Sequence, residues 1–120
     1  MRIKLSSIFV ENQDRALAFY TGVLGFKKSK EIPMGDFKWL TVISPKGYPD
    51  VELVLEPNAN PAAKTFQEAI FKQGIPITAF EVDDIDADAI ALKKKGVQFT
   101  MNPTDADRSR SRFSLIPAAI

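Results

Sequence analysis

The first 57 residues alternate short extended stretches with one amphipathic helix. Apolar and polar residues alternate over residues 5–10, which predicts a strand. Polar capping residues at 11–14 precede apolar positions at helical spacing, and Gly25 is typical of a helix C-terminus. Three more extended stretches follow at 26–32, 37–44 and 51–56, separated by turn residues at 33–36 and 45–50. This order predicts a βαβββ unit.

The second half of the chain repeats this order. After a break at 58–61, the pattern predicts a connecting helix at 62–72, a strand at 75–82, a helix at 85–95 that Gly96 ends, and a strand at 97–101. We therefore predict an α+β fold in which paired βαβββ modules form a curved mixed sheet with outer helices, the second module being incomplete at the C-terminus. The expected single domain, 1–120, has a first module at about 1–57, a connecting helix at about 58–74, a second module at about 75–105 and an atypical tail at 106–120.

Composition narrows the classes of partner. An apolar share of 45% in 120 residues can fill one core without a metal or disulfide. Sixteen basic and fifteen acidic residues give a formal charge of +1, so no overall field favours nucleic acid or a membrane surface. Neither a signal-peptide pattern nor an apolar run of membrane-spanning length is present, and we expect a cytoplasmic protein.

The chain contains neither histidine nor cysteine. This excludes Ser-His-Asp and Cys-His catalytic arrangements and removes the commonest ligand of transition metals. Asp, Glu, Lys and Tyr remain as groups that can transfer protons.

Two motifs carry a family resemblance. Residues 9–26, FVENQDRALAFYTGVLGF, resemble the first-module signature of the glyoxalase and bleomycin-resistance proteins, which with the extradiol dioxygenases form the vicinal oxygen chelate superfamily. Residues 79–86, AFEVDDID, followed by LKKKGV at 92–97, are similar to the second-module signature. Both motifs lie where the repeated pattern of elements places them, and the resemblance covers about the first hundred residues.

The resemblance implies a site in the concavity between modules, where metal-dependent members place their ligands on strands. The first-strand ligand, usually histidine, falls on Leu5, and the ligand that opens the second module falls on Ile77. A glutamate in the fourth strand of the first module survives as Glu52, and the fourth ligand has no counterpart. Because one carboxylate cannot hold a catalytic divalent ion, we expect no metal and no other cofactor.

Strand alternation extends this site to a candidate ligand pocket. Residues two apart share a face, so the pocket would combine apolar, aromatic and carboxylate side chains from Leu5, Ser7, Phe9, Trp39, Thr41, Glu52, Ile77, Ala79 and Glu81. Such a lining suits a small organic molecule that is cationic or aromatic. The alternative is that Trp39 and Phe9 are ordinary core residues and Glu52 is a solvated strand residue.

Other polar residues have simpler interpretations. Asp83, Asp84 and Asp86 precede a predicted helix, where carboxylates cap the N-terminus and oppose the helix dipole, so they are not predicted to bind metal. Tyr20 lies among apolar helical positions and is expected in the core with its hydroxyl at the rim.

The tail after Asp105 departs from the family pattern, which continues with strands of the kind GPVTIAVFDDTCGNLIQL. A permitted choice of codons for residues 106–120, read two bases later, encodes GPVTIAVFADTCGN. We therefore hypothesise a frameshift near Ala106. Alternatively, the arginine-serine run at 108–112 is a short basic arm for phosphate, although three arginines would bind weakly and in a salt-dependent way.

Loss of the family strands would leave an open sheet edge. Residues 113–116 could supply a replacement strand, and we expect a homodimer that is edge-paired or swapped. The leading functional hypothesis is a metal-independent small-molecule-binding protein, with the ligand between the modules. The alternatives are a glyoxalase-like lyase or dioxygenase relative that uses Glu52 as base or metal ligand, and a frameshifted product with no activity.

Overall fold

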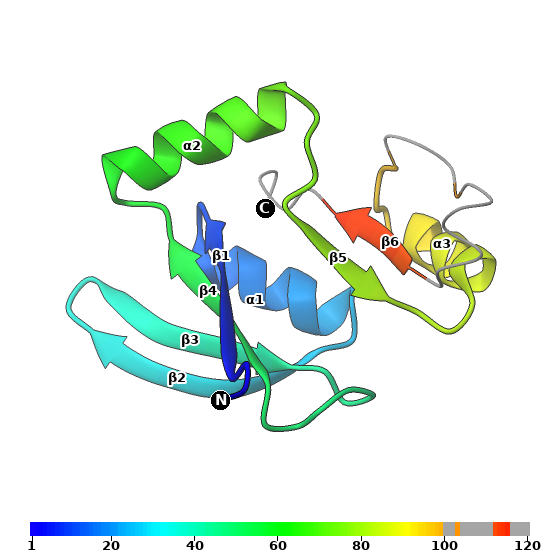
Figure 1. The fold of residues 1–120 in the computed structure, drawn as a ribbon, viewed down its shortest axis with the longest axis horizontal. Coiled ribbons are helices and arrows are strands. Elements are labelled where there is room, and N and C mark those ends of the chain that lie inside the picture. Colours follow the sequence, from blue (N-terminus) through cyan, green and yellow to red (C-terminus); the bar gives the residue numbers. More distant parts are fainter. Residues whose placement is uncertain (100–102, 104–111, 116–120) are drawn as a thin grey trace. The chain divides into compact units, whose positions relative to one another are not determined.

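The computed structural model describes residues 1–99, 103 and 112–115 and has an α+β fold (Figure 1). The described residues form two compact units, one of Met1–Ala69 and one that begins at Ile70. In the part of the chain that the structure describes, no helix is long and apolar enough to cross a membrane.

The first unit is a βαβββ module built around a mixed four-stranded sheet. Its elements are β1 (Leu5–Val10), α1 (Gln13–Gly22), β2 (Lys27–Met34), β3 (Phe37–Ile43) and β4 (Glu52–Pro57). The strand order is β1-β4-β3-β2, with β1 parallel to β4 and the other pairs antiparallel. The pattern of the first 57 residues is therefore confirmed as a βαβββ unit.

Helix α1 begins at a capped N-terminus and packs on one face of this sheet. The Asn12 side chain accepts a hydrogen bond from the Arg15 backbone N–H at 2.9 Å, which satisfies a donor that has no partner within the helix. Gly25, with φ of 81°, follows the helix in the left-handed conformation that the predicted stop requires. Ala16 and Tyr20 of α1 are completely buried. The hydroxyl of Tyr20 was expected at the rim but is buried, and burial raises its pKa.

The β2–β3 hairpin differs from its predicted boundaries. Pro33 and Met34 were placed in a turn but belong to β2, and the turn contains only Gly35 and Asp36. Proline is tolerated there because β2 is the last strand of the sheet, so one side of its backbone needs no partner. Within β2, Lys28 pairs with Val42 and Lys30 with Thr41, so the residue between the two lysines is the extra residue of a β-bulge.

The second unit contains a helix and a two-stranded sheet. Strand β5 (Thr78–Glu81) pairs antiparallel with β6 (Arg112–Leu115), and α3 (Ile85–Lys94) begins at Asp84, whose side chain accepts from the Ala87 N–H at 3.0 Å. The capping role predicted for this acidic run is confirmed at Asp84. Helix α2 (Pro61–Lys72) precedes β5 and includes residues of both units.

Two predictions for the second module are corrected. The strand expected at 97–101 does not form over residues 97–99, and residues 100 and 101 lie outside the described residues. Instead, residues 113–115 pair with β5, as proposed for a replacement strand. The strand predicted at 75–82 is shorter, because residues 75–77 lie outside β5. Most of the atypical tail, 106–111 and 116–120, also lies outside the described residues.

Candidate functional site

The sheet of the first unit has a face directed away from α1, which we call the distal face. In β1 the buried Ile8 and Val10 alternate with Leu5, Ser7 and Phe9, which share the other face. The register of β1 on β4 brings these residues beside β4 residues that also lie two apart, Leu5 beside Glu52, Ser7 beside Val54 and Phe9 beside Glu56.

Side-chain hydrogen bonds confirm which residues share the distal face. Ser7 Oγ donates to Glu56 Oε1 at 2.8 Å, and Thr41 Oγ1 of β3 donates to Glu52 Oε1 at 2.8 Å. Trp39 lies two residues from Thr41 and therefore has the same orientation. The structure thus brings together six residues of the predicted pocket on one sheet face: Leu5, Ser7, Phe9, Trp39, Thr41 and Glu52.

Glu52 is the most enclosed ionisable group on this face, with 5% of its side chain exposed. Its Oε1 accepts hydrogen bonds from Thr41 Oγ1 at 2.8 Å and Ser29 Oγ at 2.9 Å, and its Oε2 accepts from Lys30 Nζ at 3.1 Å. The hydrogen bond from Thr41 is the main cause that holds the pKa of Glu52 below its usual value, although burial opposes the shift. The alternative interpretation of Glu52 as a solvated strand residue is wrong.

The β-bulge in β2 makes this arrangement possible. The extra residue, Ser29, directs its hydroxyl to Glu52, and the Lys30 backbone N–H donates to Thr41 Oγ1 at 3.1 Å. Lys30 then lies on the same face as Glu52 and supplies the opposite charge. A single bulge therefore provides two of the three donors to a buried carboxylate.

A hollow of about 310 Å³ opens farther along the same strands, where β3 begins and β4 ends. Apolar and aromatic side chains predominate, and one carboxylate is present; the lining residues are Met34, Phe37, Lys38, Trp39, Val54, Leu55, Glu56 and Pro57. Sequence reasoning had selected only Trp39 from this set. Alternation along β4 from Glu52 would have indicated Val54 and Glu56 as well.

The two positions onto which the resemblance maps metal ligands carry exposed apolar residues. Leu5 is 43% exposed and Ile77 is 37% exposed. Among the described residues, no group of three or more His, Cys, Asp or Glu side chains is placed to hold a metal ion.

The remaining predicted pocket residues belong to the second unit. Ala79 and Glu81 are exposed residues of β5, and Ile77 lies just before this strand. Their less exposed neighbours, Thr78 and Phe80, occupy the other face of the strand. The predicted grouping of Ile77, Ala79 and Glu81 on one side is therefore consistent with the alternation.

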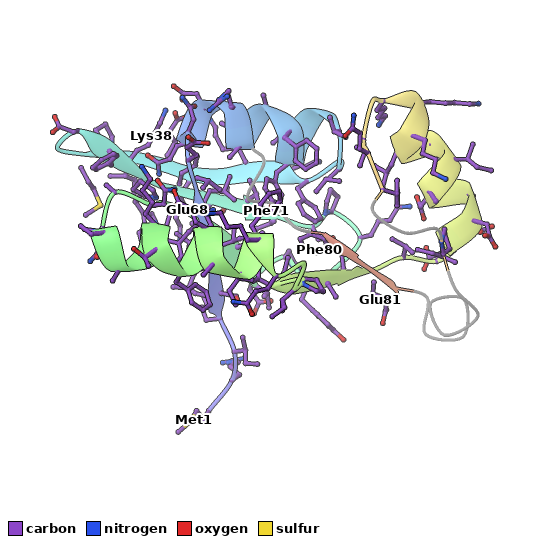
Figure 2. The ribbon with its side chains drawn as sticks, turned by 90° about the horizontal axis from the view of Figure 1, so that it is seen from above. Met1, Lys38, Glu68, Phe71, Phe80 and Glu81 are labelled. Atoms are coloured by element: carbon purple, nitrogen blue, oxygen red, sulfur yellow. The ribbon has the colours of Figure 1, made fainter. Side chains whose placement is uncertain are left out.

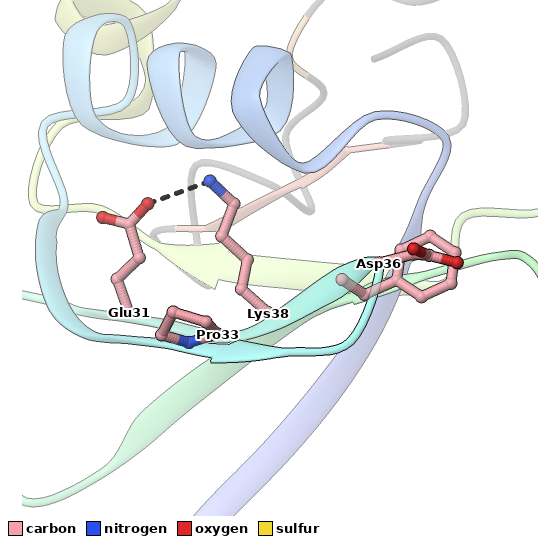
Figure 3. A pocket seen from close by; sticks show the side chains of 5 residues that line it. Glu31, Pro33, Asp36 and Lys38 are labelled. Atoms are coloured by element: carbon pink, nitrogen blue, oxygen red, sulfur yellow. Dashed lines mark hydrogen bonds and ion pairs between the residues drawn. The ribbon is translucent and has the colours of Figure 1, made fainter.

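The opposite face of the first sheet carries a second charged group, which the sequence did not suggest. Lys38 lies on the side of the sheet that faces α1 (Figure 2), and its Nζ contacts Asp14 Oδ1 at 2.7 Å and Glu31 Oε1 at 2.9 Å. Hydrogen bonds from Lys28 and Lys38 lower the pKa of Glu31 to about 2, and Asp14 and Glu31 raise the pKa of Lys38. Figure 3 shows the shallow hollow beside this network, with Glu31 and Lys38 directed toward α1. Because its charges satisfy one another, this network attaches α1 to the hairpin and is not our candidate ligand site.

Comparison with known proteins gives matches along most of the chain. Residues 2–114 match the family model described as Glyoxalase/Bleomycin resistance protein/Dioxygenase superfamily. The uncharacterized protein YurT of Bacillus subtilis (strain 168) is 52% identical over 104 residues, which cover 87% of this chain and 82% of YurT. YetH of the same organism is 30% identical over 102 residues, covering 84% of this chain and 78% of YetH.

Solved structures agree with these sequence matches. The crystal structure of UcmS2 superposes with a TM-score of 0.75 at 34% identity and covers 88% of this chain and 82% of its own. TnmS3, described as an antibiotic binding protein from Streptomyces sp. CB03234, gives a TM-score of 0.60 at 28% identity, with 86% and 78% covered. The resemblance inferred from the two motifs is confirmed, and the chain belongs to the Glyoxalase/Bleomycin resistance protein/Dioxygenase superfamily.

Proposed function

We propose that this protein binds a small aromatic molecule on the distal face without using a metal ion. The observation that carries the proposal is the hollow in which Trp39 and Phe37 lie beside Val54, Pro57 and the carboxylate of Glu56. A concave, mainly apolar surface with a few polar groups is the usual form of a small-molecule site. TnmS3, a structural relative with this fold, is itself described as an antibiotic binding protein.

The state of Glu52 makes an enzymatic alternative weaker. A general base needs a pKa near the working pH and a lone pair directed at its substrate. Glu52 has a lowered pKa, and both its oxygens already accept hydrogen bonds from protein donors. A metal ion would have to displace Lys30 and would still lack further ligands, since Leu5 occupies the neighbouring position on β1.

The ion pair between Lys30 and Glu52 changes the expected charge of the ligand. A cationic ligand was inferred from two carboxylates in the pocket, but Lys30 already compensates Glu52. Glu56 is the carboxylate that lines the hollow, and it accepts a hydrogen bond from the neutral Ser7 hydroxyl. The aromatic character of the ligand is therefore better supported than a positive charge.

A thermal-shift screen of aromatic compounds followed by calorimetry tests the binding function. A ligand that binds only the folded state raises the melting temperature. We expect Trp39→Leu to remove at least about 1.4 kcal/mol of binding free energy, a tenfold loss of affinity. Tyr48→Leu is the matched control, because Tyr48 is 79% exposed in the loop that joins the end of β3 to the start of β4, away from the hollow. Equal losses in the two variants would contradict the placement of the ligand beside Trp39.

Metal analysis of the purified protein separates binding from metal-dependent catalysis. We expect less than stoichiometric divalent metal in the wild-type protein and in Glu52→Gln alike. One equivalent of a divalent ion that is lost in Glu52→Gln would overturn the metal-independent proposal.

A second proposal concerns the coding sequence of the tail. We infer that residues 106–120 are translated out of frame, because the shifted reading restores a fourteen-residue family-like strand sequence, GPVTIAVFADTCGN. The chain with this tail would then be a frameshifted variant that lacks part of its second module and has reduced or no activity. Sequencing the gene tests this inference directly. An intact reading frame without a family-like alternative downstream of the Asp105 codon would refute it.

We also propose that the protein is a homodimer. Strands β1 and β2 are the two edges of the four-stranded sheet, and among the described residues neither pairs with a further strand on its outer side. Unpaired strand edges favour association with another chain. Light scattering after size-exclusion chromatography should give twice the monomer mass, whereas a monomeric mass at micromolar concentration would exclude this arrangement.

A further inference from the structure

The distal face carries a cation, Lys30, whose position the family resemblance did not indicate. Lys30 reaches the buried Glu52 through the β-bulge, and half of its side chain is exposed while only 5% of Glu52 is. The pair is neutral as a whole, but its positive member lies at the surface and its negative member lies beneath. Such a pair presents the positive end of a dipole to a molecule on the distal face.

The Lys30 ammonium has donor capacity left for a ligand. An ammonium group has three N–H donors, and the one acceptor that the described structure gives Nζ is Glu52 Oε2, at 3.1 Å. From this geometry we propose that Lys30 is a specificity-determining residue that binds an acceptor oxygen of the ligand, such as a carboxylate or carbonyl oxygen. This inference rests on the proposed binding function and names the chemical group that the site selects.

The positions of Lys30 and the aromatic hollow fix the orientation of the ligand. Lys30 pairs with Thr41, and Ile32 pairs with Trp39, so Lys30 and Trp39 are diagonal neighbours on one face. Two residues along a strand span roughly 7 Å, which is about the length from an aromatic ring to an attached carboxylate in a fused two-ring acid. A ring placed over Trp39 can therefore direct its oxygen to Lys30.

The other charge on this face favours the same orientation. Glu56 lines the aromatic hollow, and it lies four residues beyond Glu52 on β4, a distance of roughly 13 Å along the strand. An acidic ligand group is repelled near Glu56 and stabilised near Lys30. The oxygen of the ligand should therefore point away from the open end of the hollow and toward the β-bulge.

Three matched probes test this inference: 2-naphthoate, 2-naphthamide and 2-naphthylmethylammonium. Trp39 is the single tryptophan, so its indole N–H gives one NMR signal that reports binding at the face. A charge-assisted hydrogen bond should make 2-naphthoate bind about tenfold more tightly than the ammonium probe, with the amide between them. Calorimetry on the 120-residue chain gives the three affinities.

Variants distinguish ligand recognition from a purely structural role. Lys30→Met alone would leave Glu52 buried and unpaired, so the informative variant is Lys30→Met combined with Glu52→Gln, which removes both charges. We expect this double variant to lose the preference for 2-naphthoate, Lys30→Arg to keep it, and Lys46→Met to keep it as well. Lys46 lies in the exposed loop between β3 and β4, so its replacement removes one positive charge away from the proposed site. A structural role alone would weaken all three probes by the same factor.

The outcomes separate this inference from the proposed function. Preference for the ammonium probe, or a preference for 2-naphthoate that the double variant retains, would overturn the role of Lys30 while the binding of the probes still supports a ligand site. If none of the three probes shifts the Trp39 signal or raises the melting temperature, both the acceptor-oxygen site and the proposed aromatic site are wrong.

Discussion

Gln13 should be among the most sensitive polar residues of the first unit, because its side chain takes the place of missing strand hydrogen bonds. The pairing of β3 with β4 covers Thr41 with Val54 and Val42 with Leu53. Lys38 and Leu55 lie beyond this ladder. The Gln13 amide Nε2 donates to the Lys38 carbonyl at 2.8 Å and to the Leu55 carbonyl at 2.9 Å, and Oε1 accepts from the Lys38 N–H at 3.2 Å.

This bridge lies where the hollow of the distal face opens. Lys38 and Leu55 line the hollow together with Trp39 and Glu56. Gln13 comes from α1 and is 9% exposed, so it holds the two strands from the helix side where the strands no longer bond to each other. Loss of the bridge should therefore reduce both stability and the order of the proposed ligand site.

The expected cost follows from the three hydrogen bonds. A typical intramolecular hydrogen bond contributes about 1 kcal/mol net, and a buried group left without a partner costs about 1–3 kcal/mol. Gln13→Met keeps the volume and removes all three bonds, so the free energy of unfolding should fall by about 3 kcal/mol. For a chain of this size the melting temperature should fall by roughly 12 °C, at about 4 °C for each kcal/mol.

Urea unfolding followed by circular dichroism and by Trp39 fluorescence measures this loss. Gln73→Met is the matched control, since Gln73 is exposed after α2 and its replacement should change stability by less than about 0.5 kcal/mol. A loss below about 1 kcal/mol in Gln13→Met, or an equal loss in the control, would refute the bridging role of Gln13.

Three further predictions concern charge, capping and the Glu52 cluster. Glu52 and Glu31 have lowered pKa values in the folded state, so they stabilise the fold above their unfolded pKa of about 4.5, and this stabilisation is lost as the pH falls below that value. In an acid titration, high salt should reduce only the stabilisation due to the exposed Glu31, and Glu52→Gln should remove the stabilisation due to Glu52. Asn12→Ala removes the N-cap of α1 and should lower the free energy of unfolding by about 1 kcal/mol in urea titration, whereas an unchanged midpoint would mean that solvent replaces the cap. Thr41→Val removes the hydroxyl that bonds both Glu52 and the β2 backbone, so the free energy of unfolding should fall by about 2 kcal/mol and the apparent pKa of the acid transition should rise. Unchanged stability with an unshifted acid transition would contradict this prediction.

The local sequence pattern was sufficient to predict the type and order of the elements of the first unit. The alternation in 5–10 predicted β1 at its observed bounds, and the polar capping residues predicted at 11–14 include the observed cap of α1, Asn12. These features depend on neighbours in sequence, which a single chain displays directly. The pairing of β1 with β4, which brings Leu5 beside Glu52, was not predicted and comes from the structure.

The features that determine the chemistry of the site depend on contacts between residues far apart in sequence. Glu52 was selected from the sequence as a candidate site residue, but its partner Lys30 is 22 residues away and reaches it because of a bulge that no periodicity signals. Gln13 was read as a capping residue, yet it serves as the bridge between β3 and β4, 25 and 42 residues away. A strand that is shifted by one residue exchanges its faces, so the identity of the groups beside a buried carboxylate follows from register and not from composition.

Leu5 occupies a position where the resemblance implies a metal ligand, and this residue is consistent with the neutralisation of Glu52 by Lys30. A carboxylate that no longer binds a cation and remains buried needs another positive charge, since an unpaired buried charge is costly. The bulge supplies that charge from β2 with one ammonium group and with the hydroxyl of Ser29. Where the resemblance implies a metal site, this chain instead offers a hydrogen-bond donor beside an indole ring, and the naphthalene probes are designed to detect this donor.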